Sequence, residues 1–214
     1  MKKYILLILF NLNTFFSISQ TNNDIYVDGL LIDPNIKIEA EKHFSDYKNY
    51  SQLANIIQIY DNSFLGEFYE NDTLSFSNSD SSKKIIFKAF YFWKDNVLGI
   101  NGAFGLFGGT GFYIKISNNK ATLYHMLSSD DFPTYAYNEK DQLIDRLEVA
   151  CSDTKIVLSE IPNKENKQLI YGYVEFKSDS YYSADGANFD GENPPKIKLR
   201  NNMRIYFKCG FIEL

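Results

Sequence analysis

Alternating apolar residues between positions 84 and 127 constrain the fold more than any other feature of this sequence. The first run places five residues on one face of a strand: Ile85, Phe87, Ala89, Tyr91 and Trp93. A period of two is typical of β-strands, because successive side chains point to opposite faces of a sheet. Turn-forming residues separate the runs, at Lys94–Asn96, Gly108–Gly109 and Asn118–Asn119. The segment therefore predicts a meander of four antiparallel strands.

The second strand of this meander carries large and small residues on different faces. Leu98, Ile100 and Phe104 share one face, and the other face holds Gly99, Ala103 and Gly105. Small residues in a strand indicate a close approach of other groups or a bend. If the sheet encloses a ligand cavity, we expect the small residues to face inward and leave the space.

Further alternating runs follow the meander. They predict strands over 143–149, 155–159, 169–177 and 203–211, with turns at Ser152–Asp153 and Pro162–Asn166. Aromatic residues make up 16% of the chain and favour strands. The sequence thus predicts a mainly β fold, an antiparallel meander forming a β-barrel or a β-sandwich. The alternation is the same in both architectures.

The segment before residue 62 has helical spacing instead. Asp33 followed by Pro34 is a typical start of a helix, and apolar residues follow from Ile36 to Tyr47. A second run at 53–60 has the same spacing, although a strand remains an alternative there. We expect one or two short N-terminal helices packed on the sheet.

The first nineteen residues have the features of a secretory signal peptide. Lys2 and Lys3 precede an apolar run over 4–10, and Ser17 and Ser19 supply the small residues of a cleavage site. We expect cleavage after Ser19 and a single domain over 20–214, located in the periplasm or outside the cell. An uncleaved anchor is the alternative, but the apolar run is short for a bilayer.

The net charge of the chain limits the classes of binding partner that we expect. The chain carries a net charge of -5, and loss of the two N-terminal lysines makes it -7. An acidic chain disfavours nucleic acids and anionic membranes, since both need clustered Lys and Arg. The mature chain has no second apolar run long enough for a transmembrane helix.

Two cysteines and two histidines are the scarce reactive residues. Cys151 and Cys209 could form one disulfide in an oxidising compartment, or remain as two buried thiols.

His125 lies between apolar residues at two-residue spacing, which predicts a hydrogen-bonded histidine in the core or lining a barrel. His43 lies on the expected helix, and the spacing gives no reason for the two histidines to meet. No nucleophile motif or phosphate loop occurs, so we assign no catalytic residue.

Carboxylates in two loops provide the remaining chemical candidates. Asp130 and Asp131 are adjacent, and together with acids of the 179–192 loop they allow a hydrolase hypothesis. The same loop has oxygen ligands among glycines, a weak calcium pattern: Asp185, Asn188, Asp190 and Glu192. Its first ligand position would be Gly186, which has no side chain. Apart from calcium, we expect no cofactor.

Aromatic residues in the same loops are candidate ligand-binding residues. They are Phe132, Tyr135, Tyr137, Tyr181 and Tyr182. Exposed together they would mark a binding surface, folded over a barrel mouth they would form a lid, and packed inside they would be structural.

We therefore expect an exported, non-enzymatic binding domain that holds a small apolar ligand in a β-barrel-like cavity. One alternative is a protein-interaction module, an inhibitor or envelope assembly factor, that uses the acidic aromatic loops. The other alternative is a hydrolase with loop carboxylates.

Overall fold

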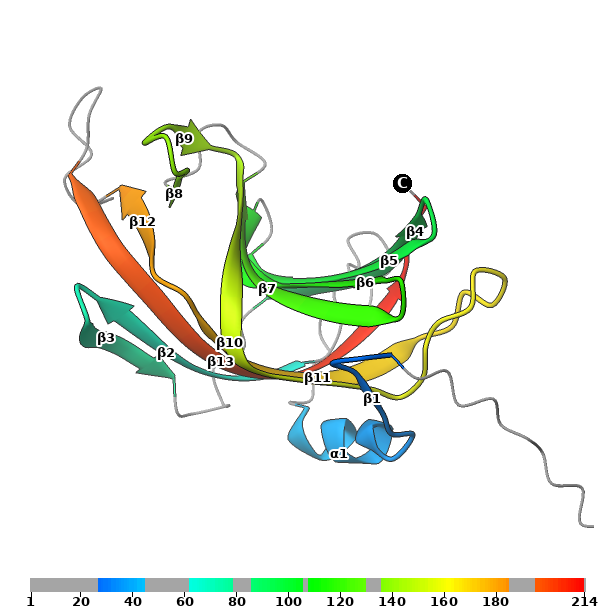
Figure 1. Ribbon diagram of the computed structural model, residues 1–214. Helices are drawn as coiled ribbons and strands as arrows, with labels where there is room; N and C mark the ends of the chain where they lie inside the picture. The colour runs from blue at the N-terminus through cyan, green and yellow to red at the C-terminus, as the bar shows by residue number, and fades with distance from the viewer. Residues whose placement is uncertain are drawn as a thin grey trace, which may run out of the picture.

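Strands dominate the structure, a computed structural model that describes residues 27–44, 62–78, 86–105, 108–129, 136–184 and 195–213 (Figure 1). Within these residues one mixed sheet of 13 strands partly closes into a ring, and the same residues contain one short helix. The mainly β fold predicted from the sequence is confirmed.

The predicted meander is present. Its four strands are antiparallel: β4 (Phe87–Lys94), β5 (Val97–Phe104), β6 (Gly108–Ser117) and β7 (Lys120–Ser129). Asp95 and Asn96 have φ of 47° and 63°, so both residues adopt the left-handed conformation of a tight hairpin. Gly108 and Gly109 are not a separate turn, because they already pair with β7 as the first residues of β6.

Three long strands complete the ring: β10 (Arg146–Leu158), β11 (Ile170–Ser178) and β13 (Lys196–Phe211). The first part of β10 pairs with β7, and its second part pairs with β11. β11 pairs with β13, which meets β4 in parallel over Gly210 and Phe211 alone. The predicted turn at Ser152–Asp153 is wrong: β10 continues through a bulge there, with φ of 49° at Asp153.

A hairpin extends the sheet beyond the ring. β2 (Asn62–Glu70) pairs with β13 on one side and with β3 (Thr73–Asn78) on the other. In Figure 1 this hairpin lies at the lower left, below the meander. Because β13 touches β4 over two residues only, the hairpin and the meander separate at this end of the ring.

Four short strands lie at the edges: β1 (Leu31–Ile32), β8 (Ala136–Tyr137), β9 (Leu143–Ile144) and β12 (Tyr181–Ala184). β12 falls in the segment predicted as a loop over 178–195. It pairs with β13, and Tyr181 and Ser183 are buried. A strand of four residues is too short to show clear alternation in the sequence.

The large residues of β5 face the core, and the space beside the small residue Gly99 is filled by a neighbouring side chain. Leu98, Ile100 and Phe104 belong to the buried core. A Cβ on Gly99 would lie 2.4 Å from the ring of Phe92, which occupies that space. The expectation that Gly99 faces inward and leaves space is therefore wrong.

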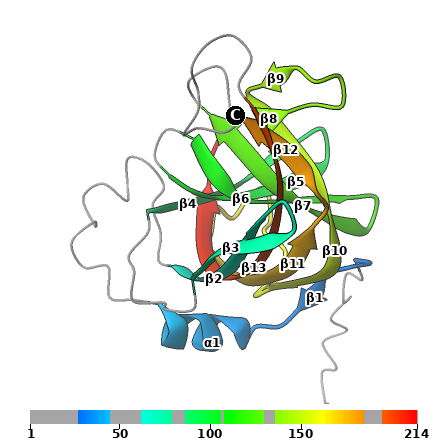
Figure 2. The ribbon, with the colours of Figure 1, turned by 90° about the vertical axis from the view of Figure 1, so that its left-hand side faces the viewer.

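Helix α1 (Ile36–His43) covers the outside of the sheet below β11, as Figure 2 shows from a second side. Ile36 packs against Val157 and Tyr173. The helix begins after Asn35, two residues later than the expected start at Asp33, whose Oδ1 accepts a hydrogen bond from the Asn35 backbone. The second expected helix and the signal peptide lie outside the described residues. With eight residues, α1 is too short to cross a bilayer, and no other described segment forms an apolar spanning helix.

Candidate functional site

An open apolar groove of about 360 Å³ lies between the β2–β3 hairpin and the meander. Four phenylalanines line it: Phe64, Phe68, Phe76 and Phe104. The remaining lining residues are Glu70, Ser75 and Thr110. The groove therefore combines aromatic walls with a few polar groups, which is the usual composition of a small-molecule site.

The phenylalanine rings form a continuous series from solvent to core. Phe76 is 47% exposed, and its ring centroid lies 5.6 Å from that of Phe68. Phe68 is 6.1 Å from Phe64, which in turn is 4.5 Å from Phe104. Phe64 and Phe104 are buried, so they fix the floor of the groove while Phe76 stands at its rim.

A buried polar cluster lies inside the ring at the same end. His125 on β7 is fully buried, and its Nδ1 lies 2.9 Å from the carbonyl oxygen of Gly111. Since a carbonyl only accepts, Nδ1 carries the proton. Nε2 then accepts a hydrogen bond of 2.9 Å from Nδ2 of Asn201, which also donates to the hydroxyl of Tyr181 at 2.9 Å. Burial lowers the pKa of His125 to about 4, so the ring is neutral at physiological pH.

The groove and the polar cluster adjoin at two places. Oγ1 of Thr110, on the groove floor, lies 3.4 Å from Nε2 of His125. Phe68 is the register partner of Asn201 across β2 and β13. A ligand in the groove would thus have its apolar body against phenylalanines and its inner end near Thr110.

No known protein family, curated protein or solved structure matches the chain. The sequence-based interpretation of His125 as a hydrogen-bonded buried histidine is confirmed, and His43 lies elsewhere, stacked on Tyr206 at 4.5 Å.

The candidate aromatic residues do not form one surface. Tyr181 is 8% exposed and belongs to the buried cluster, whereas its neighbour Tyr182 is 49% exposed. Tyr137 is half-buried under Lys196, whose Nζ lies 4.6 Å from the ring centroid. Phe132 and Tyr135 lie outside the described residues.

Apart from Asp179, the acids of the hydrolase hypothesis and all four calcium candidates lie outside the described residues. These residues are Asp130, Asp131, Asp185, Asn188, Asp190 and Glu192. Among the described residues, no group of three or more His, Cys, Asp or Glu side chains could hold a metal ion. The calcium site and the loop hydrolase remain predictions.

Both cysteines are free thiols in the structure. Cys209 is fully buried in the core, on the face predicted from the sequence. Sγ of Cys151 accepts a hydrogen bond of 3.0 Å from the backbone N–H of His125. Burial raises the pKa of both thiols, that of Cys151 to about 12, so neither is an activated nucleophile.

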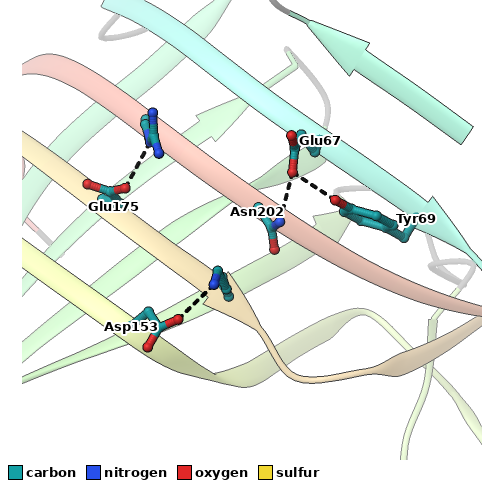
Figure 3. A network of polar contacts seen from close by, with 7 residues as sticks. Glu67, Tyr69, Asp153, Glu175 and Asn202 are labelled. Atoms are coloured by element: carbon teal, nitrogen blue, oxygen red, sulfur yellow. Dashed lines mark hydrogen bonds and ion pairs between the residues drawn. The ribbon is translucent and has the colours of Figure 1, made fainter. Parts of the chain in front are cut away.

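A second groove, of about 370 Å³, lies on the outside of β2, β13, β11 and β10 (Figure 3). Two of its three acids form ion pairs: Lys177 pairs with Asp153, and Arg204 pairs with Glu175, each at 2.8 Å. Glu67 accepts hydrogen bonds from Asn202 and Tyr69, and these bonds lower its pKa. Hydrogen bonds from Tyr173 and Arg204 likewise lower the pKa of Glu175, so Glu67 and Glu175 stay ionised at neutral pH, a state that suits an ionic surface rather than a general acid.

Proposed function

We propose that this protein is an exported, non-enzymatic binding domain that holds a small, mainly apolar ligand in the groove between β2–β3 and β5–β6. The observation that carries the proposal is the series of four phenylalanines leading from the exposed Phe76 to the buried Phe104. The groove has a volume of about 360 Å³, which is in the range of small-molecule pockets.

Exposed aromatic surface supports an apolar ligand. A phenylalanine that is 47% exposed leaves apolar area in water, and a ligand that covers it gains about 25 cal/mol per Å² removed from water. Aromatic ligands gain more, because offset or edge contacts with Phe68 and Phe76 add to burial.

Charge in the groove favours an uncharged ligand over an anion. Glu70 is the one charged residue among the described residues that line it. A carboxylate or sulfonate on the ligand would enter without a cation to pair with it and would be repelled by Glu70. Fatty-acid anions are therefore poor candidates, and neutral ring compounds are good ones.

The experiment is a fluorescence titration of residues 20–214 with N-phenyl-1-naphthylamine, an uncharged aromatic probe. We expect saturable binding to the unaltered protein and at least a fivefold weaker binding to Phe76→Ala, which removes the rim of the groove. We expect only a small change in stability, since nearly half of the Phe76 side chain is already exposed.

Tyr182→Ala is the matched control, because this aromatic residue has a similar exposure, 49%, outside the groove. It should bind the probe as the unaltered protein does. Equal binding by Phe76→Ala, or a loss confined to Tyr182→Ala, would refute the groove as the binding site. The second result would favour the interaction module.

A further inference from the structure

We propose that the groove selects ligands that carry a hydrogen-bond donor, a hydroxyl or N–H group, at the end that enters first, and that Thr110 is the residue that makes this selection. The inference rests on the proposed function and names the class of ligand more closely: uncharged ring compounds of the phenol or aromatic amine type.

The carbonyl of Gly111 determines which nitrogen of His125 carries the proton. Because it accepts from Nδ1 of His125 at 2.9 Å, the tautomer of the neutral ring is fixed, and the single lone pair of Nε2 accepts from Nδ2 of Asn201 at 2.9 Å. The ring cannot turn over, since Phe176 and Tyr181 pack against it with centroids 6.0 Å and 5.4 Å away.

This tautomer sets the direction of the Thr110 hydroxyl. Nε2 can only accept, so in the contact of 3.4 Å between Oγ1 and Nε2 Thr110 is the donor, as a second donor beside Asn201. Asn201 shares the same acceptor at 2.9 Å, which makes the threonine bond the longer of the two. His125 is the one hydrogen-bond partner of this hydroxyl within the described part of the chain.

The consequence concerns the lone pairs of Thr110. With its proton on the histidine side, the hydroxyl offers only an acceptor to the groove. Glu70, at the rim, is an acceptor as well. A hydroxyl or N–H group of the ligand could donate a hydrogen bond to Oγ1 of Thr110. An ether or ketone oxygen could not, because it and Oγ1 would both be acceptors. His125 and Asn201 are positioning residues in this arrangement, since they act through Thr110.

The test compares 2-naphthol with 2-methoxynaphthalene, which differ by the replacement of the hydroxyl proton with a methyl group. Each displaces N-phenyl-1-naphthylamine from residues 20–214 at neutral pH, where both are uncharged. We expect 2-naphthol to bind about fivefold more tightly, the factor of one ordinary hydrogen bond. Thr110→Val, of the same shape, should abolish the preference, and Thr110→Ser should retain it.

The outcomes separate the two proposals. Equal affinities of both naphthalenes for the unaltered protein, or a preference that survives in Thr110→Val, overturn the role of Thr110 and leave the groove as a binding site. If the probe and both naphthalenes fail to bind the unaltered protein, the proposed function is overturned and the inference with it. Thr122→Val, a substitution of the same kind on β7, controls for general effects and should keep the preference.

Discussion

Asn201 on β13 donates a hydrogen bond from Nδ2 to Nε2 of His125 on β7 over 2.9 Å, and this bond joins two strands that are not neighbours in the ring. Both side chains are buried, Asn201 to 2% exposure. Because buried polar groups are costly when they lack partners, the pair favours one arrangement of β13 relative to the meander. The same pair orients Thr110 at the groove.

The hydroxyl of Tyr181 gives the first prediction. Tyr181→Phe leaves one buried N–H of Asn201 without its acceptor, so the free energy of unfolding should fall by about 1–3 kcal/mol. Urea unfolding measures the change. Tyr182→Phe, which alters an exposed hydroxyl next to it, should stay within about 0.5 kcal/mol of the unaltered protein. Similar losses for both variants would contradict the buried hydrogen bond.

His125 predicts a pH dependence of stability. Its pKa is about 4 in the folded protein and 6.5 as the ordinary value, so between these values the unfolded chain binds a proton that the folded chain does not. The contribution of the neutral His125 to the free energy of unfolding is fully present above pH 6.5 and is lost as the pH falls towards 4. The total loss is about 3 kcal/mol, or about 1.4 kcal/mol for each pH unit.

Carboxylates do not obscure this effect above pH 5. The pKa values of Glu67, Asp72 and Glu175 are lowered from ordinary values of 4.5, 3.8 and 4.5, so their contributions are lost only at lower pH. Unfolding at pH 7, 6 and 5 therefore isolates His125. The variant His43→Gln should show the same pH dependence of stability, because the imidazole of His43 stacks on Tyr206 on the outside of the sheet. A constant stability over this interval would show that His125 is not buried as a neutral ring.

Thiol titration tests the state of the cysteines. In the folded protein Cys209 is fully buried and Cys151 is mostly buried, so both should react slowly with a chromogenic disulfide reagent at pH 8. Unfolding without reductant should expose two reactive thiols per chain, because both are free. If unfolding releases none, the cysteines form the disulfide that the sequence also allows.

Two glycines on β5 provide a matched pair of packing variants. A Cβ on Gly102 would lie 2.6 Å from both Phe87 and Phe112, which are fully buried and cannot move aside. Gly102→Ala should destabilise the protein by about 1–3 kcal/mol in urea unfolding. Gly99→Ala should destabilise the protein less, since its neighbour Phe92 is only partly buried and can turn away. The reverse order would mean that the large residues of β5 do not face the core.

Regular alternation was sufficient to predict much of this fold. The meander from Phe87 to Ser129 and the inward face of β13, with Cys209, follow from a period of two. The bulge in β10 was not predictable, because Ser152–Asp153 has the composition of a turn and only pairing with two different strands shows that the chain continues.

The candidate site was less accessible from sequence than the fold. Tyr181 was among the predicted ligand-binding residues, and His125 was predicted to be buried and hydrogen-bonded. Phe68, Phe76 and Thr110 were missed, since they come from distant parts of the chain that only the register of β2 and the opening of the ring bring together. One feature of the sequence points to Asn201: it is a polar residue at two-residue spacing from the inward-facing apolar residues of the last alternating strand.

Chemical-shift mapping with N-phenyl-1-naphthylamine tests the central claim most directly. Spectra of isotope-labelled residues 20–214 would be recorded as the probe is added. The account predicts shifts of amides in β2, β3, β5 and β6, largest around Phe68, Phe76 and Thr110, that saturate at one probe per chain. Saturating shifts around Tyr137 and Tyr182 instead, or no saturation at any amide, would contradict a ligand site in the phenylalanine groove.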